Sequence, residues 1–297
     1  MNLSQLYYFR KLAQLQHYTK AAKELYITQP SLNDSISSLE KELGIALFQK
    51  EGRNIRLTKH GQEFYTYVCA ALSELEKGIE AAHEKAGAIG GVIDVGCIPT
   101  LCGDFLPKAT NGYKQTRNPK VTFNIYTAMT LQIIEQVKSG AYDVGFCSKV
   151  DREPDLEFIP ILAQELVAII NHEHPLASRS GQAVSFPELA QQKLVTYRQS
   201  IPIGGIVANL LKEHGLTASF QFEDEISMGG YVSTNPVVGI AANTAFLRQF
   251  DSLDYLKLNI RADTRLVYMV YSKKNYQTKA LESFLEYVKT KETSIPR

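Results

Sequence analysis

Apolar positions in the first third of the chain recur with the period of an α-helix. Between residues 29 and 43 they stand at i, i+4, i+7 and i+11, namely Leu32, Ile36, Leu39 and Leu43. This spacing places the four side chains along one side of a helix, because a helix turns by about 100° at each residue. The segment is therefore predicted to be an amphipathic helix with one buried stripe.

Both ends of this helix carry residues that suit them. Thr28 is a suitable N-cap, Pro30 falls in the first turn where its missing N–H costs no hydrogen bond, and Gly44 suits the end. Upstream, the alanine pair at 21–22 gives a shorter helix a face that can pack closely, and residues 26–28 form the turn. Two helices joined in this way predict a helix-turn-helix unit.

The outward side of the N-terminal half of residues 29–43 carries amides, hydroxyls and one carboxylate. Asp34 lies about 200° around the helix from Leu32, opposite the buried stripe. Gln and Asn can pair with adenine, Ser with bases or phosphates, and a carboxylate with the amino group of cytosine. If this helix enters a major groove, the predicted base contacts are Gln29, Pro30, Ser31, Asn33 and Asp34. The alternative for this segment taken alone is a solvated amphipathic helix.

Positive charge is concentrated in the same part of the chain. Residues 1–60 hold nine Lys/Arg and five Asp/Glu, whereas residues 91–297 hold 21 of each. The basic N-terminal part, here called the head, precedes a neutral remainder, here called the body. This distribution indicates that the head is the part that binds a polyanion.

A cluster of these cations lies just downstream of the predicted helix. Ile55 and Leu57 alternate with polar residues beside a Gly-Arg-Asn turn, which is typical of a short β-hairpin. We predict a wing whose cations bind DNA phosphates: Lys50, Arg53, Arg56 and Lys59. The neutral groups of the helix would then read bases while the wing holds the DNA backbone.

Residues 59–88 show a seven-residue repeat of apolar positions, with a second set three residues behind the first. These are the a and d positions of a coiled-coil seam. The predicted dimerisation residues are Tyr65, Val68, Leu72, Leu75, Ile79 and Ala82. A single helix packed on its own domain could show the same stripe, so that alternative stays open.

After the glycine-rich segment at 86–91 the pattern changes. Short runs rich in β-branched and aromatic residues, such as GVIDVGC and VTFNIYTA, are typical of strands. They alternate with helical segments at 129–139, 201–214 and 276–290. This order predicts an α/β body with a largely parallel sheet.

The stretch AAKELYITQPSLNDSISSLEKELGIALFQKEGRNIRLTKHG resembles the N-terminal signature of LysR-type transcriptional regulators. The alanine pair, the Gln-Pro-Ser-Leu, the Leu-Glu…Glu-Leu-Gly…Leu-Phe and the Arg…Arg-Leu-Thr…Gly all match, over some forty residues without a gap. The sequence departs from the family pattern at Asn33, Asp34, Ser37 and Ser38, where relatives commonly carry serine, arginine and further basic residues.

The resemblance implies an α/β protein overall, with an N-terminal winged helix-turn-helix, a long linker helix and a two-lobed body similar to periplasmic solute-binding proteins. The implied divisions are a DNA-binding domain at 1–58, a linker helix at 59–88 and an effector-binding domain at 91–297, with lobe one at about 91–162 and 266–297 and lobe two at about 163–265. The implied partners are double-stranded promoter or operator DNA, a small-molecule effector and further copies of the chain, as a dimer or a tetramer.

In such lobes, ligands bind beyond the carboxyl ends of strands and against helix N-termini. The predicted effector-binding residues are Pro99, Thr100, Leu101, Thr127, Thr130, Cys147, Ser148, Arg198, Gln199 and Ser200. Arg198 is expected to supply a cation for a carboxylate or phosphate, so an anionic effector is anticipated. For each residue singly, the alternative is a plain helix cap or a surface position.

Enzyme patterns are missing from the sequence. It contains no P-loop, GxGxxG, GxSxG or HExxH motif, and His172 and His174 lack a third metal ligand. The four cysteines have the spacing of neither a disulfide framework nor a zinc site. We therefore expect no enzymatic activity, no cofactor and no bound metal.

Two other functions compete with DNA-binding regulation. One is a small-molecule-binding protein, such as a transport component, whose head only dimerises. The basic head weighs against it, as does a start that lacks a signal-peptide pattern, and no run of about 18 apolar residues predicts a membrane span, so the expected location is the cytoplasm. The other is a thiol sensor built from Cys97, Cys102 and Cys147, in which the first two could approach only if the intervening loop folds back.

Overall fold

The computed structural model describes residues 1–51, 54–85 and 90–291. The chain forms two compact units, Met1–Ala88 with the short segment Ser139–Ala141, and Ile89–Lys138 with Tyr142–Arg297. No helix within the described ranges combines the length and apolar character needed to cross a bilayer.

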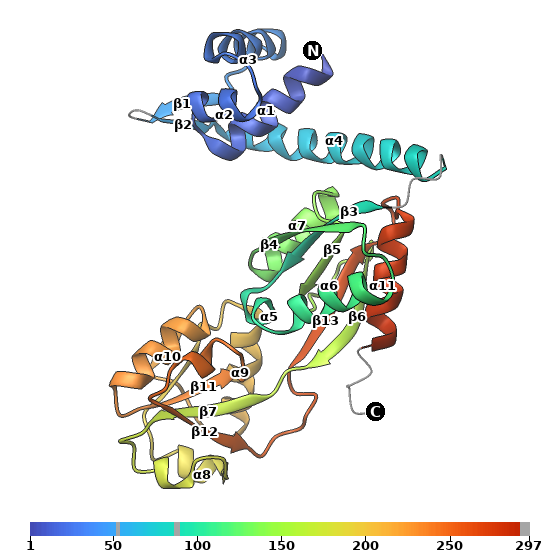
Figure 1. Ribbon diagram of the computed structural model, residues 1–297. Coiled ribbons are helices and arrows are strands. Elements are labelled where there is room, and N and C mark those ends of the chain that lie inside the picture. Colours follow the sequence, from blue (N-terminus) through green and yellow to red (C-terminus); the bar gives the residue numbers. More distant parts are fainter. Residues whose placement is uncertain (52–53, 86–89, 292–297) are drawn as a thin grey trace. The chain divides into compact units, whose positions relative to one another are not determined.

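The first unit is the predicted helical head (Figure 1). Its elements are α1 (Leu3–Leu15), α2 (Tyr18–Glu24), α3 (Gln29–Leu43), β1 (Phe48–Glu51), β2 (Asn54–Leu57) and α4 (Lys59–Lys85). The stripe on α3 is buried as predicted, since Leu32, Ile36 and Leu39 join Phe9 and Leu12 of α1 in one apolar cluster. The winged helix-turn-helix is thus confirmed.

The ends of α3 follow the capping residues in the sequence. The hydroxyl of Thr28 accepts a 3.3 Å hydrogen bond from the backbone N–H of Ser31. Gly44 ends the helix with φ of +71°, a left-handed conformation in which a side chain would be strained. Local sequence therefore sets both the start and the stop of this helix.

The second unit contains two sheets, each with its own apolar core. The first sheet has the strand order β4-β3-β5-β13-β6. Its strands are β3 (Gly91–Cys97), β4 (Val121–Thr127), β5 (Val144–Cys147), β6 (Leu156–Ala163) and β13 (Leu266–Ser272), and its helices are α5 (Pro99–Cys102), α6 (Phe105–Thr116), α7 (Thr130–Ser139) and α11 (Lys279–Lys291). Helices α6 and α11 lie side by side (Figure 1), where the rings of Tyr113 and Phe284 meet edge to face at 5.3 Å.

The second sheet has the strand order β10-β9-β11-β7-β12-β8. Its strands are β7 (Leu166–Asn171), β8 (Ala183–Val184), β9 (Leu194–Tyr197), β10 (Phe220–Phe222), β11 (Val238–Ala242) and β12 (Leu253–Leu258). The associated helices are η1 (Ala177–Arg179), α8 (Phe186–Leu189), α9 (Pro202–Glu213), α10 (Glu225–Thr234) and η2 (Leu247–Gln249). Strand β7 is buried along its whole length, in keeping with its apolar run LVAII.

The chain crosses between the two sheets twice, from β6 to β7 and from β12 back to β13. The α/β class is confirmed, but the expectation of a largely parallel sheet is wrong. Strand β7 runs antiparallel to β11 and β12, and β13 runs antiparallel to β5 and β6. Neighbouring strands run parallel where a helix connects them. Strands β7 and β13 arrive from the other sheet without such a helical connection, so each sheet contains both parallel and antiparallel pairs.

Candidate functional site

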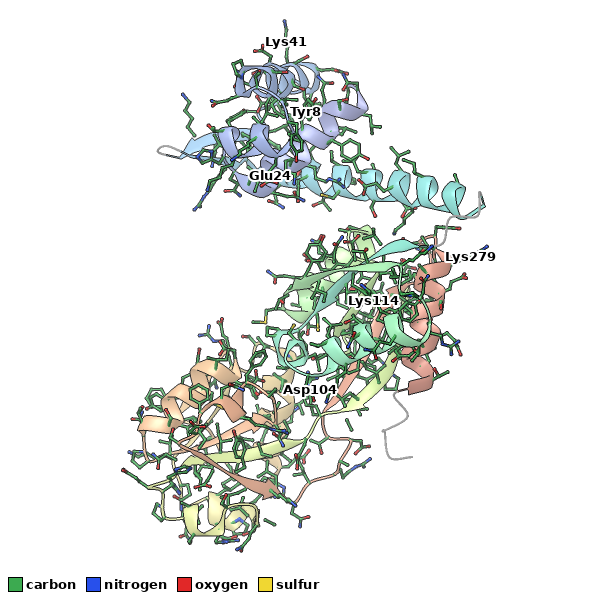
Figure 2. The ribbon with its side chains drawn as sticks, viewed as in Figure 1. Tyr8, Glu24, Lys41, Asp104, Lys114 and Lys279 are labelled. Atoms are coloured by element: carbon green, nitrogen blue, oxygen red, sulfur yellow. The ribbon has the colours of Figure 1, made fainter. Side chains whose placement is uncertain are left out.

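The outward face of α3 carries every residue that the sequence predicts for base contact. All five side chains are exposed: Gln29, Pro30, Ser31, Asn33 and Asp34. The hydroxyl of Thr19 on α2 donates a 2.9 Å hydrogen bond to Oε1 of Gln29, which orients the amide at the start of the helix. Figure 2 shows Lys41, near the other end of α3, pointing away from the rest of the head. The face is thus polar, accessible and supported by α2.

The wing is a two-stranded hairpin, as predicted, but its cations do not share one face. Arg56 pairs with Gln49 across the hairpin, whereas Lys50 pairs with Ile55 one position further on. Because side chains alternate along a strand, Arg56 and Lys50 lie on opposite faces. Lys50, Arg56 and the following Lys59 are all exposed. Arg53, also predicted to bind phosphate, lies outside the described residues.

The seven-residue stripe on α4 serves two purposes. Val68 and Leu72 are only 3% and 1% exposed, and they belong to the head's own core cluster. Tyr65 packs on the same cluster, with its ring 6.2 Å from that of Phe9. Val68 and Leu72 are therefore buried within one chain, which corrects their assignment to a dimer seam, whereas Tyr65 is only partly buried. The next two positions of the seven-residue repeat lie outside this core cluster.

Leu75 and Ile79 continue the stripe beyond the head's core, and they are exposed by 39% and 47%. Ala82, one position further along the predicted seam, is also exposed. An apolar stripe that is covered at one end and open at the other has surface left for a partner.

In the second unit, a cavity of about 310 Å³ lies where residues of both sheets and their helices meet. Five predicted residues line it: Pro99, Thr100, Thr130, Ser148 and Ser200. The other lining residues were not predicted: Ile98, Met129, Leu131, Gln132, Tyr197, Ile201, Pro202, Ile203, Glu223, Asp224, Glu225 and Arg265. Most of this wall is apolar, so a ligand with an apolar body fits it.

Helix N-termini converge on the cavity because strands of both sheets end there. The walls include the first residues of α7, α9 and α10. Asp224 caps α10 by accepting a hydrogen bond from the N–H of Ser227, whereas Ile201 at the start of α9 has no side-chain oxygen to offer. The first N–H groups of α9 therefore lack a side-chain cap, which leaves a partial positive charge at the cavity.

A chain of hydrogen bonds orders one polar part of the wall. The N–H of Ala242 donates to the Tyr197 hydroxyl at 2.9 Å, and that hydroxyl donates to Oε1 of Glu225 at 2.5 Å. Burial raises the pKa of Glu225 above 4.5, against the opposing effect of the Tyr197 hydrogen bond. Burial also raises the pKa of Tyr197 well above 10.0, so the phenol remains the donor.

Arg265 is the cation in the lining of this cavity, and no sequence pattern predicts it there. Its side chain lies on the segment that returns from β12 to β13, and it is 2% exposed. Burial lowers the pKa of its guanidinium. Nothing in the sequence pattern distinguishes Arg265 from nearby Arg261, which is exposed and paired with Asp263 at 2.7 Å. Only the fold tells the two arginines apart.

Five residues predicted at this site lie elsewhere, which corrects the prediction. Leu101 and Cys147 are buried in the core of the first lobe, where burial raises the pKa of the Cys147 thiol to about 12. Arg198 is exposed and forms a 3.2 Å ion pair with Glu223. Thr127 and Gln199 are exposed and stand outside the described lining of the cavity.

The loop after β3 does fold back, which brings two thiols together. The sulfurs of Cys97 and Cys102 lie 3.4 Å and 3.6 Å from the same carbonyl oxygen, that of Ile98. A hydrogen bond from the Cys97 thiol lowers the pKa of Cys102 to about 6, with a further contribution from the Thr127 hydroxyl. Among the described residues, no group of three or more His, Cys, Asp or Glu is placed to hold a metal ion.

Comparison with known proteins matches both units. Residues 3–62 match the family model described as bacterial regulatory helix-turn-helix protein, lysR family, and residues 86–292 match the LysR substrate binding domain. The uncharacterized HTH-type transcriptional regulator YybE of Bacillus subtilis is 28% identical over 97% of this chain and 98% of its own length. The HTH-type transcriptional regulator BenM of Acinetobacter baylyi is 27% identical over 87% of this chain and 86% of its own.

Solved structures share the fold at lower identity. CbnR, a LysR family transcriptional regulator, superposes with a TM-score of 0.76 at 20% identity, covering 98% of this chain and 99% of CbnR. Full-length CbnR in complex with its target DNA gives a TM-score of 0.75 at the same identity and coverage. The effector-binding domain of QuiR in complex with shikimate gives 0.60 at 24% identity, covering 67% of this chain and 95% of that domain.

Proposed function

The chain belongs to the LysR family of bacterial transcriptional regulators, and we propose that it reads operator DNA through the outward face of α3. The observation that carries this proposal is the exposure of Gln29, Ser31 and Asn33 on a helix that begins with an N-cap and buries its apolar stripe. Amide and hydroxyl side chains at the N-terminal half of such a helix can contact base edges in a major groove.

The wing and α4 supply the phosphate contacts. Arg56 projects from one face of the hairpin, and Lys59 begins α4. Arg56 and Lys59 are exposed cations that follow the recognition helix in sequence, so they bind the DNA backbone without regard to sequence. Lys50 points from the other face of the hairpin and contributes through its flexible stem. Asp34 lies on the base-reading face and lowers affinity for the polyanion, while it favours a cytosine amino group.

The same proposal divides the chain by role. Residues 1–58 bind DNA, residues 59–88 link and dimerise through Leu75, Ile79 and Ala82, and residues 91–297 bind a small-molecule effector. The exposed apolar stripe at the far end of α4 supports the dimer. A regulator that binds chromosomal promoters works in the cytoplasm, and the relatives YybE and BenM are HTH-type transcriptional regulators.

The effector site is the cavity between the two lobes of the second unit. Helix N-termini and strand ends from both lobes supply its walls, which supports a ligand that bridges them. A ligand held by both lobes favours the closed arrangement over the open one. Closure then changes the geometry of the oligomer and so the spacing of its DNA-binding heads.

A titration of the purified chain against DNA tests the proposed function. The chain's own upstream region is compared with a scrambled fragment at two salt concentrations. We expect tighter binding to the upstream region, and weaker binding to both fragments at the higher salt concentration because phosphate contacts release counterions. Equal and negligible binding to both fragments at low salt would contradict DNA reading by this head.

A further inference from the structure

Arg265 is a buried cation for which no ion pair is found among the described residues. Its guanidinium lines the cavity, and the hydrogen bond found for it among the described residues is a 3.0 Å contact from Nη1 to the carbonyl of Leu266. Its Nε is buried and has no partner in the described part of the chain. Glu223, Asp224 and Glu225 line the same cavity, yet within those residues none of them forms an ion pair with Arg265: Glu223 pairs with Arg198 and Asp224 caps α10.

Burying a guanidinium in this way is unfavourable. A charge removed from water needs an opposite charge and hydrogen bonds to offset its lost hydration. Within the described part of the chain, the five N–H groups of Arg265 have one carbonyl acceptor, and burial lowers the pKa of the guanidinium. The Tyr197 hydroxyl already donates to Glu225, so that carboxylate is satisfied from another side. Among the described residues, Arg265 therefore lacks a negatively charged group to pair with in this cavity.

A second observation also indicates a negatively charged ligand. The 12-residue helix α9 begins at the cavity wall with Ile201 as its N-cap, and no side chain caps it. Its first-turn N–H groups point out of the helix and carry a partial positive charge. The hydroxyl of Thr100, another lining residue, is buried without a partner among the described residues. A guanidinium, a helix N-terminus and a hydroxyl together suit one carboxylate.

The remaining wall limits the rest of the ligand. Ile98, Met129, Leu131, Ile201 and Ile203 line the cavity, whose volume is about 310 Å³. A small apolar body fits these surfaces, whereas a doubly charged phosphate would lie in one cavity with the Glu225 carboxylate and with little else to neutralise it.

We propose that the effector is a small monocarboxylate with an apolar body, and that Arg265 receives its carboxylate. This inference rests on the proposed function, which makes the cavity the effector site. The proposal also connects the ligand to the two segments that join the lobes. Arg265 lies on one of the two segments that join the lobes, and its carbonyl accepts a 2.8 Å hydrogen bond from the N–H of Gln164 on the other. A bound carboxylate therefore acts directly on the connection between the lobes.

The test uses the full chain and matched pairs of acid and amide: benzoate with benzamide, and cinnamate with cinnamamide. Calorimetry and thermal unfolding give the affinity of each probe for the wild type and for Arg265→Met, which keeps a long side chain and removes the charge. Arg198→Met is the matched control, because Arg198 is an exposed arginine outside the cavity lining. DNA binding is measured in parallel for every variant.

We expect at least one acid to bind the wild type and to raise its Tm, with its amide at least about tenfold weaker because a charge-assisted hydrogen bond is lost. Arg265→Met should abolish the preference for the acid, and Arg198→Met should keep it. Unliganded Arg265→Met should unfold at or above the wild-type Tm, because it no longer buries an unpaired charge.

Three results would overturn the inference: amides that bind the wild type as tightly as acids, an acid preference retained by Arg265→Met, or no binding by any probe. Failure of both Arg265→Met and Arg265→Gln to fold would also overturn it, since the arginine would then be structural. In each of these cases the wild type would still bind its upstream DNA selectively. Loss of that selectivity instead contradicts the proposed function itself.

Discussion

The Tyr197 hydroxyl donates a 2.5 Å hydrogen bond to the Glu225 carboxylate while it accepts one of 2.9 Å from the backbone of Ala242. One phenol thus connects the end of β9, the start of α10 and the end of β11 at the wall of the cavity. Because all three groups are buried, none of them can turn to water if the phenol is lost.

Tyr197→Phe should destabilise the second unit by about 1–3 kcal/mol, because it removes a donor from the buried Glu225 carboxyl and an acceptor from the backbone N–H of Ala242. Urea unfolding followed by circular dichroism measures this loss. Tyr67→Phe is the control: that phenol is on a side chain that is 76% exposed, so its loss should change stability by less than about 0.5 kcal/mol. Equal losses from both variants would show that the buried hydrogen bonds have no special role.

Glu225→Gln should change how stability depends on pH. Burial raises the pKa of Glu225 above 4.5, so the folded chain holds this proton at pH values where the unfolded chain has released it. The resulting stabilisation is complete below the unfolded pKa and is lost as pH rises through the folded pKa. Glutamine mimics the protonated acid at every pH and removes this loss.

The expected difference in unfolding free energy between Glu225→Gln and the wild type therefore grows in favour of the variant as pH rises above the unfolded pKa of 4.5. Denaturant titrations at several pH values measure it. Glu223→Gln, a change at an exposed carboxylate that pairs with Arg198, serves as the control. A difference that shrinks with rising pH would mean that the Glu225 pKa is lowered in the folded state.

Asp34→Arg should tighten binding to all DNA and reduce discrimination between sequences. Asp34 is exposed on the base-reading face, so an arginine there exchanges repulsion for a bond to phosphate. The slope of log affinity against log salt should steepen by about 0.9 for each additional phosphate that the arginine neutralises. Asp34→Asn separates the two effects, since it removes repulsion and adds no cation. Unchanged salt slopes in Asp34→Arg would place this residue away from the DNA backbone.

Replacing Leu75 and Ile79 together with aspartate should weaken dimerisation and leave the head folded. Both side chains are substantially exposed in the single chain, so their charges disturb only an interface. Sedimentation velocity measures the association. Leu72→Ala gives the contrast, because it opens a cavity in the head's core and should cost about 2–5 kcal/mol of stability. Dimers that survive the double change would exclude this stripe from the interface.

Cys102 should be the first cysteine to react with iodoacetamide at neutral pH. The Cys97 thiol lowers the pKa of Cys102 to about 6, whereas Cys147 has a pKa raised to about 12 by burial. The thiolate is the reactive form, so the rate should fall as pH drops through about 6. Mass spectrometry of partly labelled chain identifies the site. Cys102→Ser should remove the fast phase, and a fast phase that persists would assign it to another thiol.

Several features of this protein follow from short stretches of sequence. The stripe of α3, its Thr28 cap, its Gly44 stop and the hairpin that follows were all predictable, because helix period, capping and turn chemistry act over a few residues. The exposure of Asp34, opposite the stripe, followed from the same period. Pro99, Thr100, Thr130, Ser148 and Ser200 were likewise predicted at the cavity from their place between a strand and a helix.

Tertiary structure decided the rest, because burial depends on what packs from elsewhere in the chain. A seven-residue repeat does not reveal whether Leu72 packs on its own chain or on a partner. The fold buries Leu72 in the core of its own head and leaves Ile79 exposed. Arg198 follows a strand and looked like the ligand's cation, yet it lies in solvent beside Glu223. Arg265 follows no motif, and it becomes the charge at the cavity only because two distant segments cross there and exclude water from it.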